Sequence, residues 1–251
     1  DATLQRTRTD IALKKGTMLF PGSGWGALDL SLRNSNPVPH LDFGSTGEQQ
    51  EPWLQLQQTG RFPTLDAGAV PHSYLVQEEW FELLQKAVKG AEAGNWYAVF
   101  QLGLNYFSRQ DFERAEQCFA ASLRLQHNPW CLYALGNVRR CLGDLPGATA
   151  CLEQALRLRP GDSSLAKETL KTFKENNDCQ GLERCYALLP PSLHRVPMLQ
   201  FLHAYALANL GSLAEAERIL LQDGGLQIPD LREGECSLSE LYVYIQCEKA
   251  R

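Results

Sequence analysis

The sequence predicts an all-α helical solenoid that is preceded by an irregular N-terminal arm. The first observation is a pattern that recurs after 33 residues, in which Leu102-Gly103 corresponds to Leu135-Gly136 and Ala115 to Ala148. The second is that each repeat holds two amphipathic stretches of helical period, with small residues where the two helices cross. The third is an ordinary composition, 44% hydrophobic and 21% charged over 251 residues, which suffices for a hydrophobic core.

Residues 1–72 differ in composition from the rest of the chain. They are rich in Gly, Pro, Asn and Gln, with turn signals at Pro21-Gly22, Asn36-Pro37 and Phe43-Gly44-Ser45. The stretch from Gly16 to Phe20 can form a strand or an extended segment, and a short helix can begin at Trp25. We expect an irregular Gly- and Pro-rich arm or connector that packs against its neighbours.

Helical periodicity begins at Ser73. Tyr74, Trp80, Leu84 and Ala87 fall near one stripe, which predicts an amphipathic leading helix within residues 73–94. A solenoid is expected over residues 95–251, and its helix pairs occupy about 96–128, 129–162, 163–194 and 197–228. The third pair is degenerate, because Asn176-Asn177-Asp178 replaces the Gly turn. A last helix near residues 237–250 is expected to cover the end of the stack.

Over residues 95–228 this pattern resembles the tetratricopeptide repeat (TPR) family. The clearest copy carries Leu135-Gly136, Gly143-Asp144, Ala148, Leu152, Ala155 and Pro160. Gly136 and Ala148 permit close approach of two helices, Leu152 fills the space beside them, and Pro160 blocks continuation of the helix. The resemblance implies a binding scaffold rather than an enzyme.

A second resemblance concerns the front of the chain. The stretches Gly22–Leu28 and Gln49–Leu54 are similar to the connector of large bacterial proteins of uncharacterised function, in which a β-rich, carbohydrate-associated domain precedes TPRs. This implies that the chain is the C-terminal part of such a protein. Asp1 is not Met, and Leu4-Gln5-Arg6-Thr7-Arg8 carries no capping or targeting signal, so we expect the chain to be cut from a longer one.

Charge and cysteine usage narrow the function classes. A net charge of −5 gives no support for a nucleic-acid partner, and no apolar run approaches the roughly 18 residues of a membrane helix. The eight cysteines include no Cys-x-x-Cys pair, which argues against zinc. Cys118, Cys151 and Cys185 recur at equivalent helix positions, so we expect reduced structural thiols and a cytoplasmic protein.

Catalytic motifs are weak throughout. The five histidines have no ligand spacing, and nothing near His40 and Asp42 supplies a nucleophile or an oxyanion site. The Gly22-x-Gly24-x-Gly26 stretch lacks a dinucleotide or P-loop context and is interpreted as a turn. Trp25 and Trp53 can stack on a sugar or anchor the arm on the helices. We expect neither catalysis nor a cofactor.

The TPR resemblance implies a ligand groove, because in that family the first helix of each pair lines the concave face. The candidate groove residues are Tyr97, Phe100, Trp130, Tyr133, Asn137, Arg140, Lys167, Lys171, Phe201 and Tyr205. With Lys174 they form an aromatic front and a basic middle, which suit a peptide carrying apolar and acidic residues. Two alternatives stay open: the lysines form a solvated face, and the aromatic residues receive the N-terminal arm. The family's chaperone-tail clamp is incomplete, since Phe100 and Leu104 stand in two of its polar positions.

These observations predict a non-catalytic, cytoplasmic TPR scaffold that mediates protein–protein or interdomain contacts through its concave face. Its expected partner is a protein or peptide, including its own upstream domain, and neither nucleic acid nor membrane. The alternative is the C-terminal accessory part of a larger bacterial carbohydrate-active enzyme, whose catalytic β-rich domain lies upstream.

Overall fold

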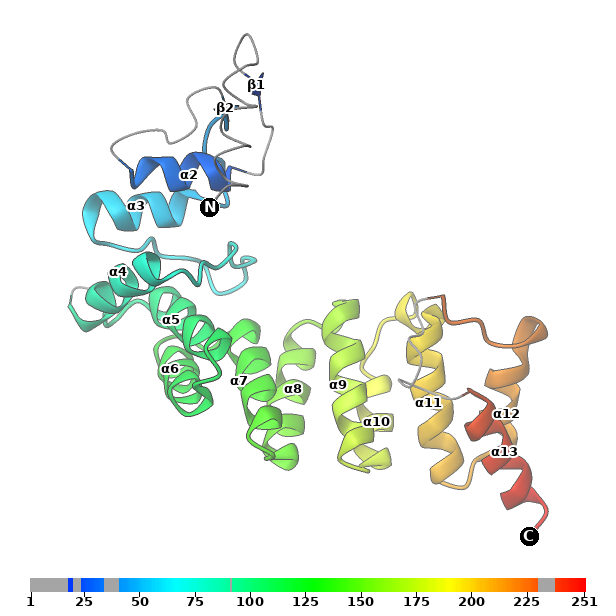
Figure 1. Ribbon diagram of the computed structural model, residues 1–251. Helices are drawn as coiled ribbons and strands as arrows, with labels where there is room; N and C mark the ends of the chain where they lie inside the picture. The colour runs from blue at the N-terminus through cyan, green and yellow to red at the C-terminus, as the bar shows by residue number, and fades with distance from the viewer. Residues whose placement is uncertain (1–17, 20–23, 34–40, 91, 230–237) are drawn as a thin grey trace, which may run out of the picture. The chain divides into compact units, whose positions relative to one another are not determined.

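The computed structural model describes residues 18–19, 24–33, 41–90, 92–229 and 238–251. Helices dominate these residues, so the all-α prediction is confirmed (Figure 1). The chain divides into two compact units, residues 1–111 and 112–251. His40, Gly22, Cys236 and the Leu4–Arg8 stretch, which entered the sequence-based expectations, lie outside the described residues.

In its described residues, the first unit combines two very short strands with four helices. Strand β1 (Met18–Leu19) pairs in parallel with β2 (Leu41–Asp42), with Met18 opposite Leu41 and Leu19 opposite Asp42. The helices are α2 (Trp25–Ser31), α3 (Glu51–Thr59), α4 (Glu78–Lys89) and α5 (Trp96–Ser108). The short helix expected from Trp25 is confirmed.

Two elements of this unit differ from the sequence-based expectation. Helix α3 lies inside the stretch that we expected to be irregular; its buried Trp53 and Leu56 hold it in place. Helix α4 begins at Glu78 rather than near Ser73, because the main chain of Ser73 is hydrogen-bonded to side chains of another segment. The Ser73 amide donates to Gln49 Oε1 at 2.8 Å, and the Ser73 carbonyl accepts from Trp53 Nε1 at 3.0 Å.

Trp53 is the centre of the first unit's core. Its side chain is fully buried, and its ring meets the rings of Phe62 at 5.3 Å and Trp80 at 5.9 Å in edge-to-face geometry. The described geometry therefore places Trp53 as an anchor between segments and leaves it no surface for stacking on a sugar.

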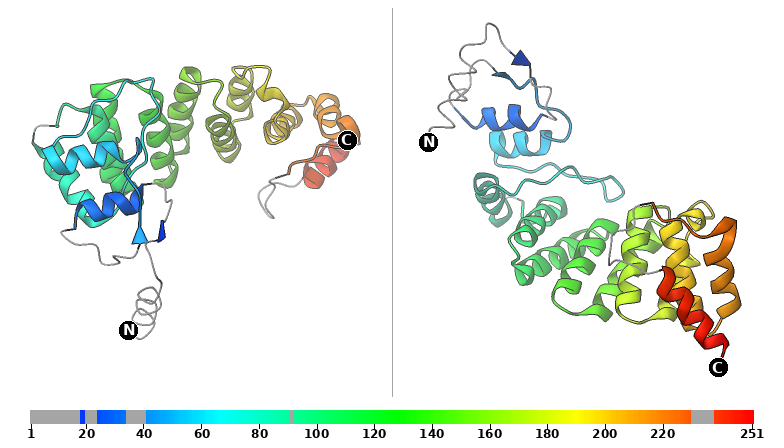
Figure 2. Two further views of the ribbon diagram at one scale, coloured as in Figure 1. Left: turned by 90° about the horizontal axis from the view of Figure 1, so that it is seen from above. Right: turned by 45° about the vertical axis from the view of Figure 1, so that its right-hand side comes forward.

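The second unit is a row of paired helices, which lie side by side in every view (Figures 1 and 2). Its members are α6 (Phe112–Leu125), α7 (Pro129–Cys141), α8 (Leu145–Leu158), α9 (Ser163–Glu175), α10 (Cys179–Tyr186), α11 (Pro197–Asn209), α12 (Leu213–Leu221) and α13 (Leu238–Lys249). Two short 3-10 helices, η1 (Leu193–Arg195) and η2 (Gln222–Gly224), precede α11 and follow α12.

The spacing of the helices follows the repeat that was read from the sequence. Helices α5, α7, α9 and α11 begin at Trp96, Pro129, Ser163 and Pro197, at intervals of 33 or 34 residues. Side-chain caps mark three of these starts, at Asn95, Asn128 and Asp162. The second unit is thus a helical solenoid of the tetratricopeptide type.

The crossing of α7 and α8 depends on Gly136. A Cβ atom at this position would lie 2.7 Å from Leu152 Cγ and 3.3 Å from the Ala148 carbonyl oxygen. Gly136, Ala148 and Leu152 are all buried there. This is the close approach that the sequence pattern predicts, and it allows Leu152 to fill the core between the two helices.

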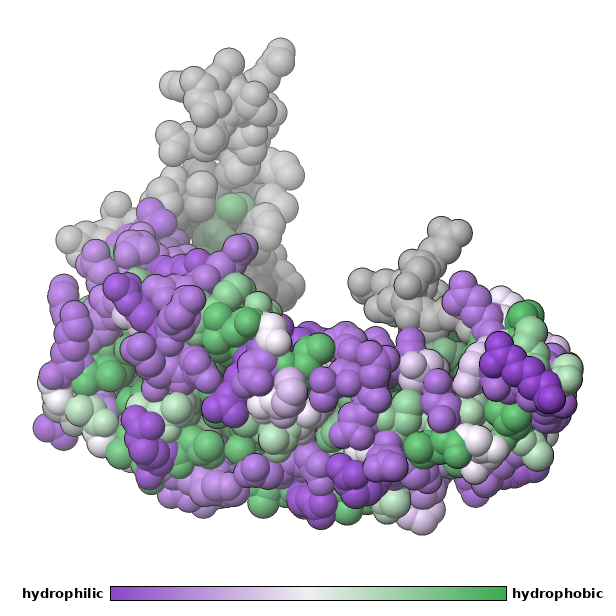
Figure 3. Space-filling view, turned by 90° about the horizontal axis from the view of Figure 1, so that it is seen from below, coloured by the Kyte–Doolittle hydropathy of each residue, from purple (hydrophilic) through white to green (hydrophobic). Residues whose placement is uncertain are grey.

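The core of the second unit is continuous from α7 to α13. It includes Leu132 of α7, Leu170 of α9, Leu199 of α11 and Ile245 of α13. On the face shown in Figure 3, hydrophilic residues surround and divide the hydrophobic ones among the described parts of the chain. The buried residues of this core come from successive helices, as expected for a solenoid.

Candidate functional site

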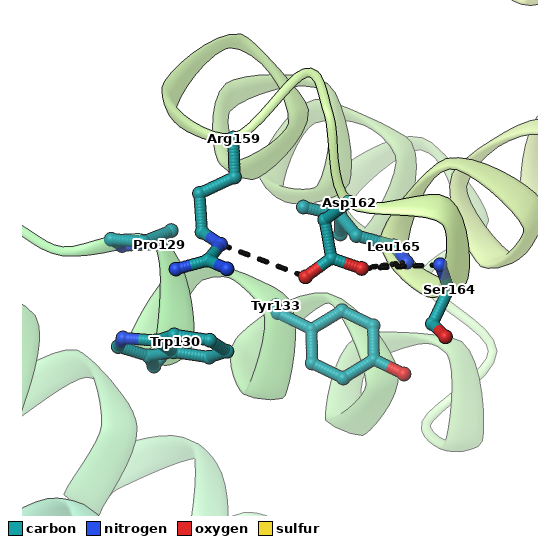
Figure 4. A pocket seen from close by; sticks show the side chains of 7 residues that line it. All are labelled: Pro129, Trp130, Tyr133, Arg159, Asp162, Ser164 and Leu165. Carbon is teal, nitrogen blue, oxygen red and sulfur yellow. Dashed lines mark hydrogen bonds and ion pairs between the residues drawn. The ribbon is translucent and has the colours of Figure 1, made fainter. Parts of the chain in front are cut away.

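A pocket of about 150 Å³ lies at the beginning of α7 and α9 (Figure 4). Helix α7 contributes Pro129, Trp130 and Tyr133, and α9 contributes Ser164 and Leu165. The loop between α8 and α9 adds Arg159 and Asp162. The pocket therefore brings together two predicted groove residues, Trp130 and Tyr133, with polar groups from a loop.

Arg159 lies over Trp130 and extends toward Asp162 (Figure 4). Its guanidinium carbon is 4.4 Å from the Trp130 ring centre, a cation–π contact. Its Nε lies 3.6 Å from Asp162 Oδ2, which is an ion pair but too long for a hydrogen bond. The buried Arg159 Nε and Trp130 Nε1 have no hydrogen-bond partner among the described residues.

Asp162 holds one wall of the pocket in place. Its Oδ1 accepts from the backbone amides of Ser164 and Leu165, at 3.1 Å each, and so caps the first turn of α9. Leu165 is buried, whereas the side chain of Ser164 is exposed at the rim. The pocket wall is thus held by a helix cap rather than by mobile side chains.

The remaining predicted residues of α7 are engaged with their neighbours. Arg140 Nη1 lies 3.6 Å from Glu168 Oε2 and 3.7 Å from Glu175 Oε1, both on α9. Asn137 Nδ2 donates to the Tyr133 carbonyl at 3.1 Å. Partial burial raises the pKa of Tyr133, which therefore stays a neutral phenol near pH 7. The positive charge of Arg140 is balanced by two carboxylates that the groove prediction did not include.

The predicted residues of α9 and α11 form a second group. Lys174 Nζ lies 5.1 Å from the Tyr205 ring centre and 5.9 Å from that of Phe201. Tyr205, Lys167 and Lys171 are half-buried. Phe201 is buried in the core between helices, so our expectation that its side chain is exposed was wrong.

Tyr97 and Phe100 on α5 are buried as well, contrary to the expectation that they are exposed. Tyr97 lies beneath residues 62–73, and its hydroxyl accepts from the His72 amide at 3.0 Å. The Phe62 ring lies 5.1 Å from the Tyr97 ring, and burial raises the pKa of Tyr97 to about 12. Phe100 packs against Trp96, with ring centres 6.2 Å apart. At Tyr97 the alternative that the aromatic residues receive the N-terminal arm matches the contacts.

Sequence reasoning missed five residues of the pocket: Pro129, Arg159, Asp162, Ser164 and Leu165. Asp162 carried a usable signal, because Asp followed by an apolar periodic segment is a helix-start signature. Arg159 carried none, since its contact with Trp130 depends on how the α8–α9 loop folds back.

Other kinds of site were searched among the same residues. In the part of the chain that the structure describes, no cluster of three or more His, Cys, Asp or Glu side chains is arranged to hold a metal ion. The helices described here are also too short or too polar to cross a membrane. Seven cysteines are described, and each is a free thiol: Cys118, Cys131, Cys141, Cys151, Cys179, Cys185 and Cys247.

Comparison with known proteins identifies similar folds only. No family model matches the chain, and no curated protein matches its sequence. The structure is similar to that of YrrB, described as a TPR protein with an unusual peptide-binding site, at 15% identity and a TM-score of 0.49 over 69% of this chain and 84% of that one. It is also similar to Pseudomonas aeruginosa PilF, at 18% identity and a TM-score of 0.45 over 68% and 72% of the two chains.

Proposed function

We propose that this chain is a non-catalytic scaffold that binds a peptide or a protein segment along α7, α9 and α11, with the pocket of Trp130 and Tyr133 as the anchor point. The observation that carries the proposal is the pocket itself, which is largely apolar and opens beside a helix that carries two aromatic residues. At a typical protein interface, a few side chains buried in well-packed pockets supply most of the binding energy. We further propose that it works in the cytoplasm, where its free thiols would remain reduced.

The size of the pocket supports a specific anchor. A cavity of about 150 Å³ can hold one benzene-sized group. The ligand is therefore expected to insert one aromatic or branched aliphatic side chain beside Trp130. The helix cap at Asp162 keeps the wall in place before the ligand arrives, which lowers the entropy cost of binding.

The charge of the ligand is expected to matter less than its anchor. Arg140 is balanced by Glu168 and Glu175, and Arg159 is paired with Asp162. An acidic ligand must compete with these carboxylates, so added negative charge brings only part of its Coulomb energy. We therefore propose an apolar site with a rim of mixed charge in place of the basic groove that the sequence suggested.

A peptide-display selection tests this function. The immobilised full chain is exposed to a random library of 12-residue peptides, and the affinities of enriched peptides are measured by fluorescence polarisation. Replacing the exposed rim residue Ser164 by Trp should block the pocket and weaken binding at least about tenfold. The matched control is Gln180→Trp, also exposed and also at the second position of a helix, which should bind normally. If the enriched peptides bind Ser164→Trp as tightly as the native chain, the pocket is not the binding site.

A further inference from the structure

Helix α9 has two sides of different electrostatic character. Toward α7 it presents Glu168 and Glu175, which pair with Arg140 at 3.6 Å and 3.7 Å. Toward α11, which packs beside it, it presents Lys174, whose Nζ lies 5.1 Å from the Tyr205 ring centre. The charges on the α7 side are thus balanced by partners in the fold, and the α11 side has to be considered separately.

The lysines of α9 follow helical spacing. Lys167, Lys171 and Lys174 are four and three positions apart, so they form one row along the helix, which we call the lysine row. All three are half-buried. Among the residues that the structure describes, no carboxylate lies within ion-pair range of Lys167 or Lys174. Helix α11 itself contains neither Asp nor Glu, so it offers the row no counter-charge.

The contacts of Lys174 differ from those of a lysine on an ordinary solvated face. Its ammonium lies against two rings of α11, 5.1 Å from the centre of Tyr205 and 5.9 Å from that of the buried Phe201. Cation–π attraction holds the charge at this place. Partial burial raises the pKa of Tyr205, which therefore stays a neutral hydroxyl near pH 7. An ammonium beside a phenol hydroxyl provides two hydrogen-bond donors, which suit a carboxylate.

The lysine row begins next to the pocket. Lys167 follows Ser164, at the pocket rim, by one turn of α9. Lys174 is ten positions beyond Ser164, which corresponds to about 15 Å along the helix axis. An extended segment covers about 3.3 Å per residue, so four to five of its residues would span about this distance.

We infer that the lysine row of α9 binds acidic side chains of the same partner segment whose apolar anchor fills the pocket, with the carboxylates up to about five residues from the anchor. The whole chain carries a net charge of −5, so an acidic segment is attracted only where positive charge is concentrated. The row therefore sets the direction in which the segment leaves the pocket. This inference rests on the proposed function and adds the charge pattern of its ligand.

Parallel display selections test the charge pattern. A random library of 12-residue peptides, fused to the carrier through their C-termini so that no free terminal carboxylate is present, is selected against the native chain and against Lys167→Gln/Lys174→Gln. Peptides from the native chain should be enriched in Asp and Glu about four to five residues from an apolar residue. With the variant, the apolar residue should still be enriched and the acidic residues should not.

Affinities of the enriched peptides, made with amidated C-termini, are then measured by fluorescence polarisation. Lys167→Gln/Lys174→Gln should weaken binding about three- to tenfold at low salt, less than Ser164→Trp does, and added salt should reduce the difference. Lys86→Gln/Lys89→Gln, at two exposed positions of α4, removes the same charge and should bind normally. Lys167→Arg/Lys174→Arg should keep most of the affinity, and thermal melting verifies that each variant is folded.

The outcomes separate this inference from the proposed function. If the selected peptides need the pocket but are not acidic, or if the α4 control weakens binding equally, the scaffold function stands and the inference is wrong. The inference also fails if acidic peptides need the lysines yet bind Ser164→Trp normally, because the row and the pocket would then not share a ligand. A labelled twelve-nucleotide DNA strand that binds through the lysines would likewise overturn it. If the enriched peptides need neither the pocket nor the lysines, both proposals fail.

Discussion

The turns inside four helix pairs favour residues that can adopt a positive φ. The turns that join α5 to α6, α7 to α8, α9 to α10 and α11 to α12 each contain one residue with positive φ, namely Gln110 (60°), Gly143 (81°), Asn177 (55°) and Gly211 (89°). Glycine adopts a positive φ without strain, and asparagine tolerates it. Glutamine has a longer side chain and adopts it only at a cost in free energy. The Asn177 turn of the degenerate pair is therefore a conservative replacement for glycine, while the Gln110 turn is strained.

Replacing Gln110 by Gly should stabilise the protein. The substitution relieves a left-handed conformation that costs about 1–2 kcal/mol, and it loses part of that gain to the larger unfolded-state entropy of glycine. We expect a net gain of about 0.5–1 kcal/mol, measured by urea denaturation, and a smaller gain for Asn177→Gly. The matched control is Gln154→Gly inside α8, which should cost about 1 kcal/mol. Equal effects at the two glutamines would show that turn strain is not the cause.

At the scale of elements, an aromatic stack joins α10, η1 and α11. The Tyr186 ring lies between His194, with ring centres 4.6 Å apart, and His203, with ring centres 3.9 Å apart. His203 Nε2 lies 3.1 Å from Glu183 Oε2. Burial lowers the pKa of His203 from its ordinary value of 6.5, while Glu183 and Glu215 oppose this effect and His194 adds to it.

This stack should make the α10–α11 junction sensitive to acid. Because the folded state holds His203 at a lowered pKa, its stabilising contribution is present above pH 6.5 and is lost as the pH falls below that value. The thermal midpoint should therefore drop more steeply between pH 7 and pH 5 in the native protein than in His203→Phe, which keeps a stacked ring but cannot titrate. His127→Phe, at an exposed position, is the control and should keep the native slope.

The elements that the sequence predicted correctly share one property. The helices from α5 onward bury regular stripes, and their caps and small crossing residues lie where the period places them. Helix α3 was missed because it has only nine residues and is held by Trp53, whose contacts come from Phe62, Ser73 and Trp80. Tyr74 was assigned to the stripe of α4 yet is exposed, since it precedes Glu78, where α4 begins. Short elements fixed by distant contacts leave little periodic signal.

The candidate site was predictable only where its residues lie on a helix of regular period. Trp130 and Tyr133 follow from the helical register of α7, and both line the pocket. The burial of Tyr97 was not predictable from register, because it depends on contacts with Phe62 and His72, which lie outside α5. Arg159 and Asp162 reach the pocket through a loop, where no period applies. Register identifies which face a residue occupies, but only the path of the connecting segments decides whether that face stays open.

At the scale of the whole molecule, the second unit should lose its structure locally rather than all at once. In a solenoid each helix pair contacts its neighbours, so stability is close to a sum of terms for single repeats and for the interfaces between them. The core that runs from α7 to α13 is continuous, yet Leu132 in α7 and Leu199 in α11 lie in different repeats. A destabilising substitution in one repeat should therefore promote unfolding only of that repeat and the adjacent helices.

Hydrogen exchange in two cavity variants tests this behaviour. Leu199→Ala removes a fully buried side chain and should cost about 2–5 kcal/mol, which corresponds to exchange that is about thirtyfold faster or more in α10–α13. Protection in α6 and α7 should change little, because their interfaces are intact. Leu132→Ala is the reciprocal variant and should reverse the pattern, with faster exchange in α6–α8 and near-native protection in α12 and α13. If each variant instead raised exchange equally across residues 112–251, the unit would unfold as one cooperative block. A ligand at the pocket of α7 and α9 would then protect α13 as strongly as α7.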